Sequence, residues 1–378
     1  MNQFRISLYY FFQFFSGGAF HAYGGIWFAS KGFSANEIGA LNSFPIFLVL
    51  LSNIFVGRIA DRASDWRQVI VIGATASFLF SVGLLFFDDY VPIFVFWSLA
   101  LIAQSLLVPV GDGAAMFLTQ QGRAQIGTLR GLSTVGYLVS LFVTGYAIEG
   151  FGGAAFAMLF VGFSALRALG AAVLPNFKSP LERLADTPPL GFTLFRNYFL
   201  SLPLLGWSIV YATHQVLNSF IALLFKQQGI EESVIGWLLA SGAATEALVF
   251  FLFQHVAKRF DLRLMILLSC CVAVVRWIAM AQEPSLPVLF GLQLLHGITY
   301  ALGFVSCVSF IGRQTSSGNA AEAQSLFNVM QMVSAIVVIT LFGGLVEAYG
   351  SGAYYGSAVV ALIGILVVAY GLRSTPLR

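Results

Sequence analysis

Apolar runs long enough to cross a bilayer recur about every thirty residues along the chain, and this repetition limits the possible folds more than any other feature. A helix needs roughly 20 apolar residues to span the hydrocarbon core of a membrane. The runs lie at residues 6–28, 38–57, 69–87, 91–117, 130–148, 154–174, 200–224, 234–255, 264–281, 286–310, 324–346 and 354–372. We therefore predict an all-α membrane protein with twelve transmembrane helices.

The content of charged residues supports this class. Of the 378 residues, 58% are hydrophobic and 9% are charged, whereas soluble domains carry about 25% charged residues. The net charge of +3 does not indicate a nucleic-acid partner, because the basic residues cluster in loops rather than on one face. The three cysteines lack the spacing of a metal site, and we expect neither a metal nor a cofactor.

The placement of lysine and arginine predicts the orientation in the membrane. With an even number of spans, both termini face the same side. The basic residues on that side are Arg5, Arg58, Arg62, Arg67, Arg123, Lys178, Arg183, Arg196, Lys258, Arg259, Arg263, Arg313, Arg373 and Arg378. Lys31 and Lys226 fall on the other side. Because cytoplasmic loops carry the excess of basic residues, we expect both termini in the cytoplasm. We also expect the chain to lie in a bacterial inner membrane.

The chain is predicted to consist of two six-helix bundles, residues 1–174 and 200–378, joined by a flexible cytoplasmic linker at 175–199. The halves share a sequence repeat. Lys31-Gly32-Phe33 recurs 197 residues later as Gln228-Gly229-Ile230, and Glu37-Ile38-Gly39 recurs as Val234-Ile235-Gly236. Parallel repeats of this kind are typical of transporters whose substrate site lies between the halves near the bilayer midplane.

An acid and a base lie inside the hairpin formed by the fourth and fifth spans. Asp112 and Arg130 are each nine residues from Gln121 at the turn, roughly 13 Å along each helix. A charge in hydrocarbon costs roughly 2.5–3.5 kcal/mol on insertion scales and marks a functional site by default. We expect this pair to contact substrate; the alternative is a structural pair that stabilises the hairpin.

The second half carries further polar residues inside its spans. Glu246 is the leading candidate for a proton carrier, and Arg276 and His296 could approach it. The structural alternatives are a neutral glutamate bonded across helices and a histidine that only packs. One face of the seventh span is polar, which favours the wall of a water-filled cavity. Its residues are Tyr211, His214, Gln215 and Asn218.

Arg167 lies inside the sixth span. Long basic side chains near a helix end can extend to the membrane interface. We expect Arg167 to do so and assign it no functional role.

The loop after the second span reads Gly57-Arg58-Ile59-Ala60-Asp61-Arg62 and resembles the GxxxDR signature of the major facilitator superfamily. Within that superfamily the chain is most similar to the lactose-permease and phenylpropionate-permease branch of proton symporters. Asp112 and Arg130, with Gly127 before the arginine, match the substrate-binding charge pair of that branch. Tyr137 stands where a stacking aromatic ring is expected.

The resemblance extends to the second half of the chain. Glu246, Arg276 and His296 match in order the acid, arginine and histidine that the branch places on helices 8, 9 and 10. One position departs from the pattern. Thr299 stands where lactose permease has a glutamate that takes part in proton release, so that relay cannot be transferred in full.

These observations predict a secondary transporter, most readily a proton symporter of an aromatic or other organic acid. A sugar or nucleoside permease is the alternative. The sequence has no HExxH or GxSxG motif of a membrane enzyme, and a sensor would need a signalling appendage. The expected partners are a small-molecule substrate, protons and the lipid bilayer, with the chain acting as a monomer.

Overall fold

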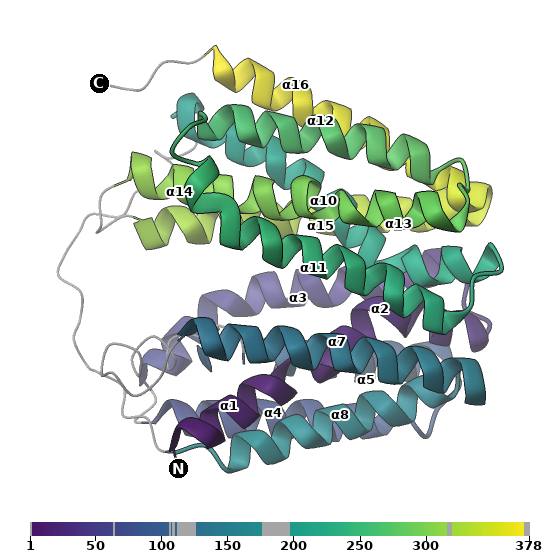
Figure 1. Ribbon diagram of the computed structural model, residues 1–378. Coiled ribbons are helices and arrows are strands. Elements are labelled where there is room, and N and C mark those ends of the chain that lie inside the picture. Colours follow the sequence, from purple (N-terminus) through teal and green to yellow (C-terminus); the bar gives the residue numbers. More distant parts are fainter. Residues whose placement is uncertain are drawn as a thin grey trace. The chain divides into compact units, whose positions relative to one another are not determined.

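The prediction of twelve membrane-crossing helices is confirmed, because each of the twelve apolar runs contains helix. The computed structural model describes residues 2–62, 65–105, 107, 110–111, 126–175, 197–315 and 320–373 (Figure 1). Its helices in the first half are α1 (Asn2–Gln13), α2 (Phe15–Ser30), α3 (Ala35–Arg62), α4 (Trp66–Gly83), α5 (Tyr90–Ser105), α7 (Ile126–Phe151) and α8 (Ala155–Ala172). Those in the second half are α10 (Tyr198–Gln227), α11 (Glu232–Val256), α12 (Leu262–Met280), α13 (Leu286–Leu294), η1 (Gly297–Leu302), α14 (Gly303–Gln314), α15 (Ala320–Tyr349), η2 (Gly350–Ala353) and α16 (Tyr354–Leu372).

Two of the predicted spans are interrupted helices. The first is divided at Phe14 into α1 and α2. The tenth contains a π-helical turn, η1, between α13 and α14. The GxxxDR motif also differs from the expectation, because α3 continues through Arg62 and the motif therefore lies in the end of a helix rather than in a loop.

The repeat between the halves is visible in how two helices end. Gly32 follows α2 with φ of 85°, and Gly229 follows α10 with φ of 79°. In each case the next residue donates its N–H to the carbonyl five residues back, Phe33 to Phe28 and Ile230 to Phe225. This is the Schellman motif, which needs a left-handed residue and therefore favours glycine.

Helices α4 and α12 also begin alike. Asp65 precedes α4 and its Oδ1 accepts from the N–H of Arg67 at 2.9 Å. Asp261 precedes α12 and accepts from the N–H of Arg263 at 2.7 Å. Each aspartate satisfies a free donor at a helix N-terminus, where a negative charge is also favourable.

The described part of the chain divides into two compact units. The first contains residues 1–182 and 219–236, and the second contains residues 183–218 and 237–378. In the first unit α4 packs against α5 and α8, and α7 packs against α1 and α2. A core of buried side chains joins these helices, including Ile6, Tyr10, Ile70 and Leu129.

Loops that the sequence places on the same side of the membrane contact each other in the first unit, and one such contact is present for each of the two sides. Lys31, after α2, forms an ion pair with Asp88, before α5. At the start of α4, the Nη2 of Arg67 donates to the carbonyl of Ala172 at the end of α8, at 2.8 Å. Loop pairing in this unit therefore agrees with the predicted alternation of sides.

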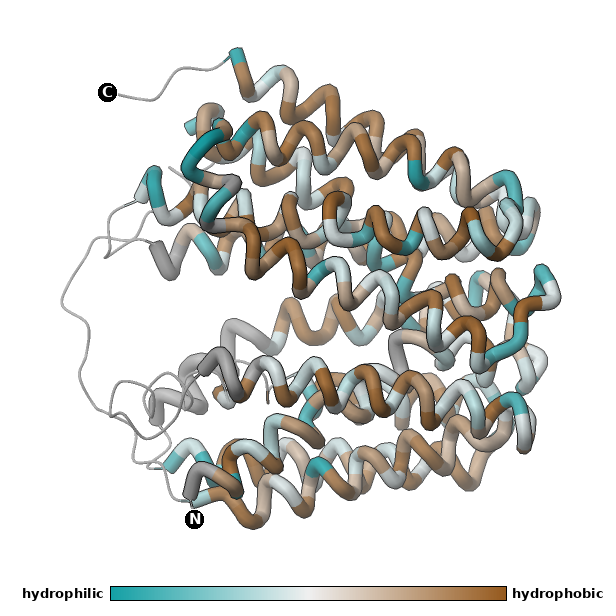
Figure 2. Tube along the Cα trace, viewed as in Figure 1, coloured by the Kyte–Doolittle hydropathy of each residue, from teal (hydrophilic) through white to brown (hydrophobic). Residues whose placement is uncertain are grey.

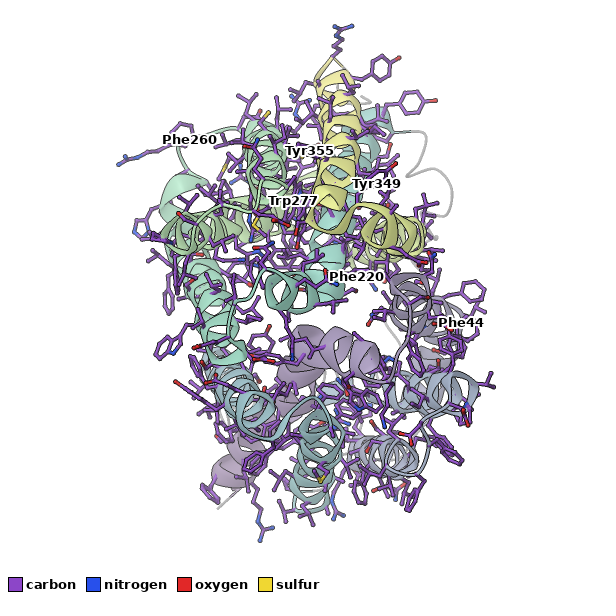
Figure 3. The ribbon with its side chains drawn as sticks, turned by 90° about the vertical axis from the view of Figure 1, so that its right-hand side faces the viewer. Phe44, Phe220, Phe260, Trp277, Tyr349 and Tyr355 are labelled. Atoms are coloured by element: carbon purple, nitrogen blue, oxygen red, sulfur yellow. The ribbon has the colours of Figure 1, made fainter. Side chains whose placement is uncertain are left out.

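In the second unit α12 packs against α16, α14 and η1. Its Trp277 is completely buried and stacks on Tyr354 with ring centroids 5.9 Å apart. By contrast Tyr349 and Tyr355 are exposed on the outside of their helices (Figure 3). Such exposed aromatic and aliphatic side chains suit a surface that faces lipid rather than water.

The hydropathy of the helices agrees with a bilayer setting. Figure 2 shows helices that are mostly hydrophobic, with hydrophilic residues gathered towards their ends. Nine helical stretches of the described residues are long and apolar enough to cross a membrane, one of them covering α15 and α16 together. The predicted linker at 175–199 falls almost entirely outside the described residues.

Candidate functional site

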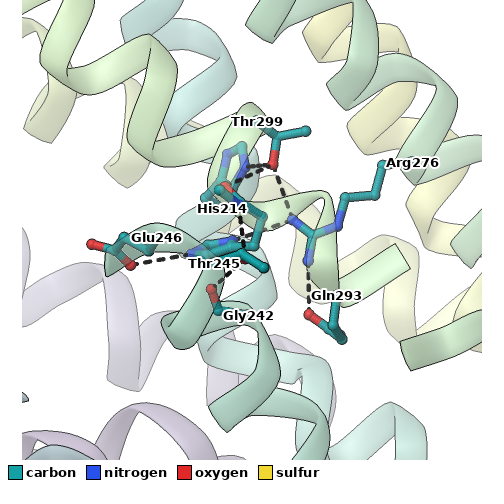
Figure 4. A network of polar contacts seen from close by, with 9 residues as sticks. His214, Gly242, Thr245, Glu246, Arg276, Gln293 and Thr299 are labelled. Carbon is teal, nitrogen blue, oxygen red and sulfur yellow. Dashed lines mark hydrogen bonds and ion pairs between the residues drawn. The ribbon is translucent and has the colours of Figure 1, made fainter. Parts of the chain in front are cut away.

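Four of the residues singled out in the sequence meet in one polar network in the second unit (Figure 4). They come from four different spans: His214 from α10, Glu246 from α11, Arg276 from α12, and His296 from the turn between α13 and η1. The residues are up to 82 positions apart in sequence, so the network depends on how these helices pack.

Arg276 is completely buried, and its guanidinium is held by neutral acceptors in the described part of the chain. Its Nη1 donates to Thr299 Oγ1 at 3.2 Å and to His296 Nδ1 at 3.3 Å, and its Nη2 donates to Gln293 Oε1 at 2.8 Å. The guanidinium carbon also lies 4.9 Å from the centre of the Trp277 ring, a favourable cation–π distance. These contacts fix the orientation of the Arg276 guanidinium, and none of its bonded acceptors among the described residues is a carboxylate.

The contact with Arg276 determines where the proton sits on His296. A guanidinium can only donate hydrogen bonds, so Nδ1 must be the ring nitrogen that accepts. The ring proton is therefore on Nε2, which lies 3.6 Å from Glu246 Oε2. While Arg276 keeps this bond, His296 is neutral and directs its single N–H towards the glutamate.

The same reasoning applies to His214, which is 1% exposed. Its Nδ1 lies 3.1 Å from the carbonyl of Val210, which can only accept, so Nδ1 carries a proton. Its Nε2 lies 3.0 Å from Thr299 Oγ1. In the neutral ring Nε2 accepts from the Thr299 hydroxyl, whose oxygen in turn accepts from Arg276.

Thr299 therefore connects residues of two other spans within the network. Its hydroxyl contacts both Arg276 and His214, and its carbonyl accepts from the hydroxyl of Ser269 at 2.8 Å. The sequence drew attention to Thr299 only as a position that cannot carry a proton. Nothing in the sequence indicates that two spans would bond to it.

Two layers can be distinguished in the network by exposure. Arg276, His214, Thr299 and Gln293 are buried, whereas the side chains of Glu246 and His296 are 30% and 17% exposed. The outer pair can therefore meet water or a solute, and the inner layer holds it in place.

Aromatic rings continue the outer layer along η1 and α14. His296 and Tyr300 stack with centroids 5.1 Å apart, and Tyr300 stacks on Phe304 at 6.2 Å, both nearly parallel. Tyr211 of α10 lies 6.2 Å from Tyr300. Tyr300 and Phe304 were not among the candidate residues, because an aromatic residue in an apolar run carries no distinguishing signal.

Close packing between α11 and η1 brings Glu246 to His296. The N–H of Gly297 donates to Thr245 Oγ1 at 3.3 Å, and this hydroxyl donates to the carbonyl of Gly242 at 2.8 Å. A side chain on Gly297 would place its Cβ 2.7 Å from the Thr245 carbonyl oxygen. Only glycine at this position allows the two backbones to approach so closely.

The rest of the polar face predicted on the seventh span lies beside the network. Tyr211, Gln215 and Asn218 are half-buried on α10, and Tyr211 is hydrogen-bonded to Gln215. In contrast to these three, His214 is buried in the inner layer.

Other candidates from the sequence lie in the first unit or outside the described residues. Asp112 is outside the described residues, and Arg130 lies in α7 with a side chain that is not described. The structure therefore does not test their pairing. Tyr137 is half-buried in α7, where its backbone and ring face Gly18 of α2.

The residues of the GxxxDR-like motif lie at the end of the second span. Gly57, Arg58, Asp61 and Arg62 lie in α3, and their side chains are not described. Among the described residues, no group of histidine, cysteine, aspartate and glutamate is arranged to hold a metal ion.

The expectation that Arg167 extends to the membrane interface is wrong. The side chain is completely buried, and its Nη1 and Nη2 donate to Ser16 Oγ at 2.6 Å and Ser77 Oγ at 2.7 Å. Ser16 in turn donates to Gln104 Oε1 at 3.3 Å. Arg167 thus ties α8 to α2 and α4 through hydroxyl acceptors within the unit.

Comparison with known proteins agrees with this architecture. A model of the MFS_1 like family matches residues 3–355. The chain is 26% identical to the probable 3-phenylpropionic acid transporter of Escherichia coli (strain K12), with 94% of each chain covered. It is 22% identical to the maltose permease of Geobacillus stearothermophilus, with 96% of this chain and 92% of the permease covered.

Solved structures show the same fold at lower sequence identity. The nucleoside transporter NupG superposes with a TM-score of 0.86 at 17% identity, covering 99% of this chain and 100% of that one. A bacterial homologue of the human lysosomal transporter Spinster, in an inward-facing and occupied conformation, gives a TM-score of 0.79 at 14% identity, covering 99% and 96%. Since the family model spans most of its length, this chain belongs to the MFS_1 like family of membrane transporters.

Proposed function

We propose that this transporter is a proton-coupled symporter that takes up a small organic solute, with an aromatic or other organic acid as the favoured substrate. The family consists of transporters rather than enzymes, so the proposal concerns coupling and substrate. Alternating access would proceed by movement of the two halves around a central site, as in other transporters built from parallel repeats.

The contact that carries the proposal is the approach of His296 Nε2 to Glu246 Oε2 at 3.6 Å, with Arg276 bonded to the other ring nitrogen. Glu246 is partly exposed, so a proton can reach its carboxylate from water. Because Arg276 keeps His296 neutral, the glutamate is the group of this trio that can gain and lose a proton. The His296 N–H, directed at the carboxylate from 3.6 Å, favours the ionised form electrostatically.

Movement of the helices would then change the proton affinity of Glu246. With the His296 N–H nearby, the ionised carboxylate is favoured and the proton leaves. When α11 moves away from η1, the carboxylate loses this donor and binds a proton more readily. A change in one helix contact can therefore load the glutamate on one side of the membrane and unload it on the other.

The preference for an acid is supported by the similarity to the probable 3-phenylpropionic acid transporter and by arginine chemistry. A guanidinium binds a carboxylate through two parallel hydrogen bonds.

For the first half we propose that Asp112, Arg130 and Tyr137 contact the substrate. For the second half, Tyr211, Gln215 and Asn218 remain proposed contacts, while His214 acts from behind the outer layer.

A sugar or nucleoside permease is the second candidate. It is supported by the full-length similarity to a maltose permease, since acid–arginine pairs also bind hydroxyl groups and aromatic rings pack against sugars. We further propose that the chain works as a monomer in a bacterial inner membrane. The placement of lysine and arginine supports an orientation with both termini in the cytoplasm.

Uptake by the purified protein in proteoliposomes tests the proposal. Labelled phenylpropionate, maltose and uridine would be offered with and without an inward pH gradient, and protein-free liposomes would correct for passive entry of the acid. We expect protein-dependent accumulation of the acid that collapses with the gradient. Accumulation of maltose or uridine instead would establish the second candidate, and uptake unaffected by the gradient would contradict proton coupling.

A further inference from the structure

We infer that the transporter couples one proton to one monocarboxylate anion by charge balance at Glu246 and Arg276, so that each transport step carries no net charge. This inference rests on the proposed function and adds the substrate charge and the stoichiometry. It depends on which groups of the buried network are charged.

In the described part of the second unit, the network contains one permanent charge and one variable charge. Arg276 is always a cation, and Glu246 is either an anion or neutral. The groups that face these two from the surrounding helices are neutral: His214 of α10, Gln293, His296 and Thr299 of the tenth span, and the phenol of Tyr354 of α16. The bond from Arg276 keeps His296 neutral, and a second positive charge on His214 is disfavoured because this ring is buried and shares the Thr299 hydroxyl with the Arg276 cation.

The empty network is therefore balanced when Glu246 is ionised, because its negative charge offsets that of Arg276. Protonation of Glu246 removes this balance and leaves a buried cation whose partners are neutral. A buried charge that lacks an opposite charge is unfavourable in a medium of low dielectric constant. A carboxylate anion bound beside the outer layer restores the balance.

Two neutral states follow, one empty with Glu246 ionised and one with Glu246 protonated and an anion bound. The two mixed states carry a net charge: an anion with ionised Glu246, or an empty site with protonated Glu246. If only the neutral states change conformation readily, a proton and an anion must cross together. One proton and one monoanion then move in the same direction and their charges cancel.

Thr299 is important for this scheme because it stands where an acid would give the network a second negative charge. With glutamate at that position, Arg276 would be balanced whether or not Glu246 held a proton, and anion binding would lose its connection to the proton. The threonine hydroxyl supplies an acceptor for Arg276 without adding charge.

The test compares an imposed membrane potential with an imposed pH gradient in proteoliposomes that contain the wild-type protein. For electroneutral symport, a gradient of about one pH unit should give about tenfold accumulation of phenylpropionate. A potential of about 100 mV, set with potassium and valinomycin at equal pH, should leave accumulation unchanged. If one net charge crossed with each substrate, that potential would instead raise accumulation about fifty-fold.

The outcomes separate this inference from the proposed function. Potential-driven accumulation of phenylpropionate, or of a neutral solute such as maltose or uridine, would overturn charge balance and leave proton-coupled transport standing. Absence of uptake for acids and neutral solutes alike would overturn both.

Binding measured against pH gives a second test. In the wild type, affinity for phenylpropionate should fall up to tenfold per pH unit once Glu246 loses its proton, because anion and proton bind together. In Glu246→Gln, which mimics the protonated acid, affinity should not change with pH. Glu231→Gln, in an exposed position before α11, serves as the matched control. A wild-type affinity independent of pH would contradict the inference.

Discussion

A guanidinium bonded to neutral acceptors keeps its charge available, whereas one paired with a carboxylate does not. Arg276 is of the first kind among the described residues, with a hydroxyl, an imidazole nitrogen and an amide oxygen as acceptors. Arg167 in the first unit is held in the same way by Ser16 and Ser77. Each bond of this kind contributes about 1.5–3 kcal/mol, which offsets part of the cost of burying the charge.

Replacement of Thr299 tests how the inner layer positions the outer one. Thr299→Val keeps the shape of the side chain but removes the hydroxyl that accepts from Arg276, at a cost of about 1–3 kcal/mol in the free energy of unfolding. Once Arg276 is released from its anchor, His296 Nδ1 can take a second ring proton. We therefore expect a lower midpoint of thermal unfolding and an additional titration step in the pH profile of uptake.

Thr299→Ser provides the control, because it keeps the hydroxyl and should keep the wild-type pH profile. A valine variant with an unchanged pH profile would show that Thr299 only fills space.

The sequence was sufficient to identify most of the candidate residues, but it did not predict which residues they would bond to. Glu246, Arg276 and His296 were recognisable because charged and titratable residues are rare inside apolar spans. The role of Thr299 was not recognisable, since a threonine in a spanning helix usually bonds to its own backbone. Arg167 was misjudged because the hydroxyls that hold it come from two other helices.

At the scale of the helices, the π-helical turn η1 determines which side chains the tenth span presents. A π-helical turn within a longer helix is rare and frequently lies at a functional site. Here it lies directly after His296 and contains Thr299 and Tyr300. Gly297 begins the turn and allows the contact with Thr245 of α11.

Gly297→Ala tests this contact between α11 and η1. The added Cβ would lie 2.7 Å from the Thr245 carbonyl oxygen, so one helix must move and Glu246 must separate from His296. We expect reduced thermal stability and a loss of accumulation that exceeds the loss of substrate binding. Gly291→Ala in α13 is the matched control, because nothing lies within 4 Å of its Cβ position and alanine favours a helix by about 1 kcal/mol. Equal behaviour of the two variants would remove the proposed importance of the contact.

The sequence predicted the spans themselves well, because length and apolar character are sufficient to recognise a membrane helix. It did not predict the break at Phe14, the extension of α3 to Arg62 or the π-helical turn at Gly297. These details depend on contacts between helices, and no short-range pattern in the sequence specifies them.

At the scale of the whole molecule, the two halves follow one plan. Gly32 and Gly229 end corresponding helices with the same motif, and Asp65 and Asp261 begin corresponding helices with the same cap. The repeat was detectable in the sequence because such positions require particular residue types. The repeat does not indicate which residue pairs with Asp112, and Asp112 itself lies outside the described residues.

The orientation in the membrane can be measured with single cysteines in a variant in which Cys270, Cys271 and Cys307 are replaced by alanine. Asp186→Cys should react with an impermeant thiol reagent only from the cytoplasmic side, and Glu231→Cys only from the outside, because the basic loops remain in the cytoplasm. Reaction of both positions from the same side would contradict the predicted topology.

The central claim is that Glu246 carries the proton, and Glu246→Gln tests it most directly. Glutamine mimics the protonated acid but cannot release a proton. Accumulation against a concentration gradient and exchange of internal for external substrate would be measured side by side in proteoliposomes, with Glu231→Gln as control. We predict that Glu246→Gln retains exchange and loses pH-driven accumulation. Full pH-driven accumulation by Glu246→Gln would contradict the claim.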